Sequence, residues 1–128
     1  GHSDMRDIIE NAAKGDENCA FAIDAFVYSL LKTIGSYVAV LGGVDALIFT
    51  AGIGENASLV REKLCARLAY LGIELDGEKN RARPAPAEIS APQSKVKVYV
   101  IPANEELMIA SETFALLDEL AETEPLAV

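Results

Sequence analysis

A glycine pair between an apolar run and a helical pattern carries the strongest chemical signal in this sequence. Gly52 and Gly54 stand in the stretch FTAGIGEN, residues 49–56, directly after the apolar run 46–49. Glycine lets the backbone approach a ligand closely, and the free N–H groups at the start of a helix point at negative charge. The pattern therefore predicts an anion or nucleotide site in a loop over 52–56. A plain strand-to-helix turn would use the same residues, and the spacing does not choose between the two.

Two specific nucleotide motifs can be compared with this stretch. A P-loop requires Lys and Ser or Thr after its second glycine, but Glu55 and Asn56 stand there, so this motif is excluded. A dinucleotide fingerprint fits better, because Ala57 supplies the third small residue and Glu74 or Asp76 lies near the expected distance. However, Glu55 would face the pyrophosphate, and a long helix precedes the strand. A dinucleotide-binding domain is therefore the alternative interpretation.

Polar residues also begin two other predicted helices. Glu105 and Glu106 follow a strand and Asn104, where one carboxylate could hold Mg²⁺ or could simply complement the helix dipole. The spacing alone favours the second explanation. Asp4 and Arg6 begin the first helix, where they are either solvated or able to bind a ribose and stack on a base, since a guanidinium is planar.

Apolar spacing predicts the elements that must position these residues. Helices are expected over 4–15, capped by Ser3 or Asp4, and over 16–42, capped by Asp16. The second is apolar over most of its girth and should be buried on more than one side. An unbroken apolar run predicts a strand over 44–50 covered on both faces.

Further helices and a second strand are predicted in the second half of the chain. A helix is expected from near Asn56 to Gly72, followed by a surface excursion over 76–95 with an edge strand near Ile89. A strand over 96–100 and a helix from Asn104 complete the pattern. The last helix should direct one apolar face inward, formed by Leu107, Ala110, Phe114 and Leu117. Alternating strands and helices predict an α/β fold, and with only two confident strands, residues 1–128 are expected to be a single partial domain of a longer protein.

Composition limits the function further. The 128 residues are 51% hydrophobic and carry a net charge of −9, which excludes intrinsic disorder and makes a nucleic-acid partner improbable. Cys19 and Cys65 lie in apolar helical patterns and are expected to be buried free thiols of a reducing compartment. With one histidine a zinc site is nearly excluded. We expect no apolar run to reach the length of a membrane span and no signal peptide to open the chain, so the protein is expected to be soluble and cytoplasmic.

Taken together, these stretches resemble the C-terminal portion of the acetate kinase family, in the family's own order. The matching stretches are SDMRD at 3–7, DALIFTAGIGENASLVRE at 45–62, LGIELD at 71–76 and VIPANEELMIA at 100–110. The resemblance implies parallel strands with flanking helices, as a partial ribonuclease-H-like domain of the sugar-kinase, heat-shock-chaperone and actin superfamily. It also implies ATP, Mg²⁺ and acetate as reactants, giving acetyl phosphate and ADP, although close relatives act on propionate or butyrate.

The resemblance assigns a role to each of the stretches above. Asp4, Met5 and Arg6 would line the adenosine pocket, and Glu105 would hold Mg²⁺. The loop beside the adenine and phosphates would consist of Gly52, Ile53, Gly54, Glu55 and Asn56. The family's acetate-binding arginine, catalytic aspartate, histidine and second arginine have no counterpart here, so we expect no turnover by this chain alone. The family is dimeric through C-terminal surfaces, so self-association is expected.

Two small residues depart from the family pattern. Ala51 stands where many members have glycine, and Ala103 where many have threonine. We expect little loss of the loop shape from either change.

Overall fold

Aspartate caps divide the first forty residues into two helices. The computed structural model describes residues 4–82 and 86–123. Asp4 accepts a 2.8 Å hydrogen bond from the Arg6 N–H at the start of α1, Met5–Ala13, while Ser3 lies outside the described residues. Asp16 caps α2, Glu17–Leu41, which ends at Gly42 with a left-handed φ of 74°. The predicted caps and the glycine stop are therefore confirmed.

The described strands form one small sheet of order β1-β3-β2. Strand β1, Ala46–Phe49, pairs in parallel with β3, Lys97–Val100, and β2, Ala87–Glu88, pairs antiparallel to β3. The α/β prediction is confirmed, but the expectation of only parallel strands is wrong. Strand β2 returns to β3 through a short connection, and a connection without a crossover helix gives an antiparallel pair.

The hydrophobic core joins α2, the sheet and α4, Ser58–Arg67. Leu68 and Val98 are fully buried at its centre, and Leu64 is 1% exposed. Burial alternates along β1, where Phe49 is buried and Ile48 is 54% exposed. The prediction that this strand is covered on both faces is therefore wrong, because within the described part of the chain its outer face has no covering layer.

Part of the segment predicted as a surface excursion packs into the body, within its described residues 76–82 and 86–95. Helix α5, Gly77–Arg81, follows a short 3-10 turn, η1, Ala69–Leu71, and is capped by Asp76. Ile89 is 1% exposed, next to strand β2, and its N–H donates to the Val98 carbonyl at 2.8 Å. The predicted edge strand is confirmed. Most described residues of the predicted excursion are exposed, but Asn80, Ile89 and Ala91 are buried, so the segment also contributes to the interior.

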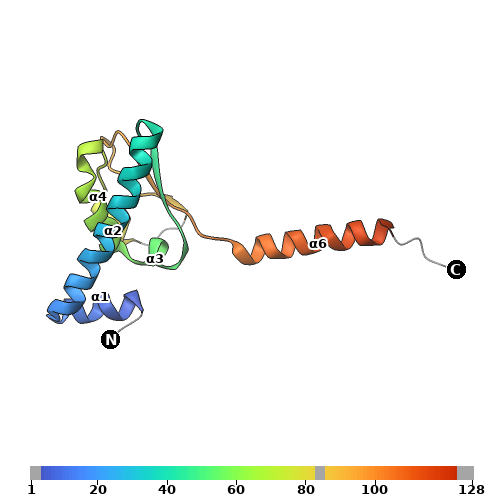
Figure 1. Cartoon of the computed structure of the whole chain (residues 1–128), viewed down its shortest axis with the longest axis horizontal. Coiled ribbons are helices and arrows are strands. Elements are labelled where there is room, and N and C mark those ends of the chain that lie inside the picture. Colours follow the sequence, from blue (N-terminus) through green and yellow to red (C-terminus); the bar gives the residue numbers. More distant parts are fainter. Residues whose placement is uncertain (1–3, 83–85, 124–128) are drawn as a thin grey trace.

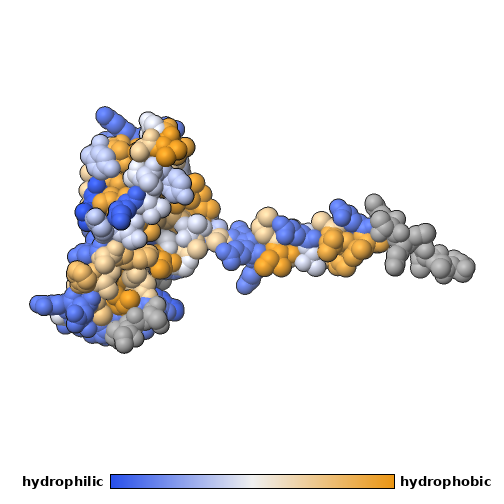
Figure 2. All heavy atoms as spheres, in the orientation of Figure 1, coloured by the Kyte–Doolittle hydropathy of each residue, from blue (hydrophilic) through white to orange (hydrophobic). Residues whose placement is uncertain are grey.

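Two helices expose apolar faces that were expected to be buried. Helix α6, Glu105–Thr123, stands clear of the body in Figure 1, and Figure 2 shows apolar side chains along its surface. Phe114 is 70% exposed, and the other three predicted inward residues, Leu107, Ala110 and Leu117, are exposed as well. In α2 only Cys19, Ile23 and Val27 are buried. Both predictions are wrong because, among the described residues, no layer meets these faces.

Helix α2 is long and apolar enough to cross a membrane by length and composition, contrary to our expectation. One such helix is weak support for a membrane span, because core helices pass the same test. In this fold α2 packs against α1 and α4, and its Asp24 pairs with Lys63 of α4 at 2.7 Å.

Both cysteines are free and buried, as predicted. Burial raises the pKa of the Cys65 thiol to about 12, and burial is also the main cause that raises the pKa of Cys19.

Candidate functional site

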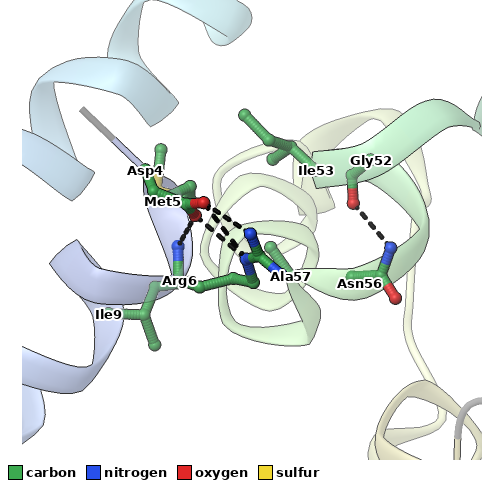
Figure 3. A pocket seen from close by; sticks show the side chains of 8 residues that line it. All are labelled: Asp4, Met5, Arg6, Ile9, Gly52, Ile53, Asn56 and Ala57. Atoms are coloured by element: carbon green, nitrogen blue, oxygen red, sulfur yellow. Dashed lines mark hydrogen bonds and ion pairs between the residues drawn. The ribbon is translucent and has the colours of Figure 1, made fainter.

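A cavity of about 730 Å³ opens between the start of α1 and the segment that follows β1. Its wall comes from two parts of the chain that lie far apart in the sequence (Figure 3). The lining residues are Asp4, Met5, Arg6, Ile9, Gly52, Ile53, Asn56 and Ala57. The structure therefore brings together most of the site residues that the sequence predicted.

The segment after β1 is a short helix and not the predicted loop. Helix α3, Ala51–Asn56, is six residues long and its N-cap Thr50 makes no side-chain capping bond. The Asn56 amide donates to the Gly52 carbonyl at 2.9 Å and closes the turn. Helix α4 begins at Ser58, slightly later than predicted. The tight return is possible because Gly54 lies against β1, where an added Cβ would stand 3.3 Å from the Phe49 carbonyl carbon.

Ala51 enters α3 in the left-handed region of the backbone, with a φ of 59°. Residues with a Cβ reach this region at a cost of about 1–2 kcal/mol, which glycine avoids. The sequence predicted little loss of the loop shape from Ala51, but alanine carries a backbone cost at this position. Replacing Ala51 with glycine is expected to raise the free energy of unfolding by about 1 kcal/mol, measured by urea denaturation. Unchanged or lower stability would show that the backbone is relaxed here.

Asp4 and Arg6 form an ion pair at the rim of the cavity. The Arg6 Nη2 lies 2.6 Å from the Asp4 Oδ2, and the Arg6 Nε is 3.1 Å from the Oδ1. The hydrogen bond from the Arg6 side chain is the main cause that lowers the pKa of Asp4 to about 2. The carboxylate is therefore charged at neutral pH, and its pairing orients the guanidinium plane beside the cavity.

The ion pair predicts a pH effect on stability. A carboxyl pKa that is lower in the folded chain gives stability above the ordinary value of about 4, and this stability is lost as the pH falls toward 2. Asp4→Asn keeps a good cap but removes the charge. The difference in melting temperature between the two chains should shrink from pH 5 to pH 2. A carboxyl resonance of Asp4 that titrates near pH 4 would contradict this.

Three predicted site residues do not line the cavity. Gly54 supports the turn from behind, as described above. The Glu55 carboxylate accepts a 2.9 Å hydrogen bond from the Ala103 N–H, so it ties α3 to the segment that leads into α6. The Glu55 side chain is thus bonded to backbone, and Glu105 lies just beyond that bond at the first position of α6.

Glu105 is exposed and suits one kind of metal binding. Among the residues that the structure describes, no group of three His, Cys, Asp or Glu side chains could hold an ion. Mg²⁺, however, often takes only one or two protein carboxylates and completes its shell with water and phosphate oxygens. Glu105 offers one such exposed carboxylate, although it is not among the residues that line the cavity.

Sequence reasoning missed a buried polar pair behind the site. Arg61 and Asn80 are each 2% exposed, and the guanidinium bonds both Asn80 and the last carbonyls of α3. The signal available in the sequence was Arg61 itself, a charged residue that directly follows the apolar Val60 within a predicted helix.

The chain is similar to kinases that are named for small carboxylic acids. The solved acetate kinase of Porphyromonas gingivalis is 42% identical with a TM-score of 0.80, over 90% of this chain and 29% of that one. A propionate kinase of Francisella tularensis is also 42% identical, with a TM-score of 0.79, over 88% of this chain and 28% of that one. The fold is thus that of a kinase segment.

The family match is more specific. The model of the acetokinase family matches residues 1–111, and the chain belongs to that family. The acetate kinase of Carboxydothermus hydrogenoformans is 53% identical over 117 residues, which are 91% of this chain and 29% of that protein. The chain therefore spans about three tenths of the length of the relatives it matches.

Proposed function

We propose that this chain supplies the nucleotide-binding segment of an enzyme that transfers a phosphoryl group between ATP and acetate, giving acetyl phosphate and ADP. The observation that carries the proposal is the shared cavity. Residues 4–6 and residues 52–56 were predicted to contact one nucleotide, and residues 4–6 line one cavity together with Gly52, Ile53 and Asn56. Its volume of about 730 Å³ lies within the usual range for small-molecule sites. We further propose that the sheet belongs to a ribonuclease-H-like domain.

The cavity offers complementary chemistry to an adenosine. The Asp4 carboxylate can accept hydrogen bonds from ribose hydroxyls, and the Arg6 guanidinium can stack on the base. Ile9 and Ile53 add apolar contacts, while Asn56 supplies an amide. A bound Mg²⁺ would neutralise phosphate charge, and Glu105 is the residue that would hold it.

Nucleotide binding can be tested on the chain as it stands. A ligand that binds only the folded state raises the melting temperature, so ADP with Mg²⁺ should stabilise the chain and NAD should not. Asp4→Ala combined with Arg6→Ala should reduce the shift from ADP, whereas Lys14→Ala, on an exposed side chain beyond the end of α1, should not. Stabilisation by NAD alone would favour the dinucleotide-binding alternative and overturn the proposal.

We also propose that these 128 residues do not turn over alone. The matched part is 29% of the relatives' length, and the acetate site is proposed to lie in the part without a counterpart here. Acetyl phosphate formation should be absent with the chain alone and should appear when it is mixed with the unmatched N-terminal part of the Carboxydothermus relative. Binding of ADP without restored activity on mixing would favour a non-catalytic nucleotide module. The same assay with propionate would test the acyl preference.

We propose that the enzyme self-associates as a homodimer. We also propose that it acts in the cytoplasm and binds neither DNA nor a membrane. Leu41 of α2 and Phe114 of α6 are at least 70% exposed, and large apolar faces of this kind mark interaction surfaces. Light scattering of the chain should show a mass above 13.6 kDa that rises with concentration. Phe114→Glu should reduce this rise, and a constant monomer mass would contradict the proposal.

A further inference from the structure

Arg61 is a buried cation whose hydrogen bonds end on the nucleotide-site helix. Its side chain is 2% exposed. The Nη1 atom donates to the carbonyl of Gly54 at 2.8 Å and to that of Glu55 at 2.9 Å. These are among the last carbonyls of α3, which have no partner within so short a helix. The guanidinium therefore supplies donors that α3 itself lacks, at the helix end that favours positive charge.

The other side of the guanidinium is fixed by Asn80 of α5. Arg61 Nε donates to the Asn80 Oδ1 at 2.7 Å, and Nη2 donates to the Asn80 carbonyl at 2.8 Å. The Asn80 amide in turn donates to the Ser58 carbonyl at 3.0 Å. Asn80 is as deeply buried as Arg61. The pair thus connects α3 to α5 through the interior of the body.

Helix α3 requires such external support. It is six residues long, contains two glycines and has no side-chain cap. A helix of this length is not stable by itself, and the left-handed Ala51 at its start adds backbone strain. Strained conformations persist only where the surrounding structure over-determines them.

We propose that Arg61, held by Asn80, is the positioning residue of the nucleotide site. It fixes α3 from behind and so places Gly52, Ile53 and Asn56 along the cavity wall, without touching the ligand. A guanidinium is required, because its planar fork donates to α3 and α5 at once, whereas an ammonium is a compact point charge. The consequence for nucleotide binding rests on the function proposed above.

Arg61→Lys in the 128-residue chain tests this assignment by two readouts. Without ligand, hydrogen exchange at the amides of α3 should become about tenfold faster or more, while the amides of Leu64 and Leu68 keep their rates. Titration with ADP and Mg²⁺ should show an affinity about tenfold lower. Arg67→Lys is the matched control, because Arg67 lies exposed on the same helix with its guanidinium 5.8 Å from the Tyr28 ring. It should change neither readout.

Asn80→Ala is the second variant, and it decides the question if Arg61→Lys does not fold. It removes the contact with Nε and leaves the guanidinium in place, so both effects should appear in weaker form. A folded variant in which α3 exchanges as in the wild type, or in which ADP binds with unchanged affinity, would overturn the assignment. If the wild type does not bind ADP while α3 exchange still rises in the variants, the proposed function fails and the support of α3 by Arg61 stands.

Discussion

Replacing Leu68 with alanine is expected to lower the free energy of unfolding by about 2–5 kcal/mol. Leu68 is fully buried in the same core cluster as Val98 of the central strand, so truncation removes apolar contacts and leaves a cavity. This loss is a large fraction of the total stability of a small domain, which is about 5–15 kcal/mol. Urea denaturation followed by circular dichroism would measure it, as a lower midpoint with an unchanged slope.

Leu117→Ala provides the matched control for this prediction. Leu117 is 55% exposed on α6, so the same truncation should change stability by no more than about 0.5 kcal/mol in dilute solution. Equal losses at both positions would show that α6 packs on the body. A loss at Leu117 that appears only at high protein concentration would show burial by self-association.

Gly54→Val is expected to cost about 1–3 kcal/mol of stability and to reduce nucleotide binding. A Cβ at this position would stand 3.3 Å from the carbonyl carbon of Phe49, which is backbone of β1 and cannot rotate away. The branched side chain must therefore push α3 from the strand, and Gly52, Ile53 and Asn56 would leave their places on the cavity wall. Denaturation and titration with ADP and Mg²⁺ would measure the two effects.

Gly52→Ala is the control that separates steric contact with β1 from the loss of glycine's backbone freedom. An added Cβ at Gly52 has no atom within 4 Å, and alanine favours the helix. Its stability should therefore equal or slightly exceed that of the wild type. A loss at Gly52 as large as that of Gly54→Val would assign the effect to backbone freedom and not to contact with β1.

Local patterns in the sequence predicted the ends of helices and the strands well, because interactions between neighbouring residues determine these features. Asp16 and Gly42 delimit α2 because a carboxylate satisfies the first N–H groups and a left-handed residue ends the helix. The alternation of Val98 and Val100 with polar neighbours predicted β3 for a similar reason. In contrast, the same apolar periodicity on α6 predicted burial, which depends on whether another layer meets that face.

The site could be predicted only in part from the sequence. Residues 4–6 and α3 were grouped by the family resemblance, and the structure places residues 4–6 with Gly52, Ile53 and Asn56 around one cavity. The direction of the Glu55 side chain could not be predicted, because its bond to the Ala103 N–H joins positions 48 residues apart. The support of α3 by Arg61 was missed for the same reason, since Asn80 lies 19 residues further on, in a segment that looked like solvated loop.

The two buried thiols allow local opening of the fold to be measured by alkylation. Only the thiolate attacks an alkylating reagent, and burial holds Cys65 in its protonated form with a pKa of about 12. Cys19 is 6% exposed near the start of α2, whereas Cys65 is 2% exposed on α4 and belongs to the core. Iodoacetamide reacts more slowly than an opened helix recloses, so it should modify each sulfur in proportion to the fraction of molecules in which that sulfur is exposed. A time course read by mass spectrometry would report the opening around Cys19 of α2 and around Cys65 of α4 separately, from thiols that the chain already contains.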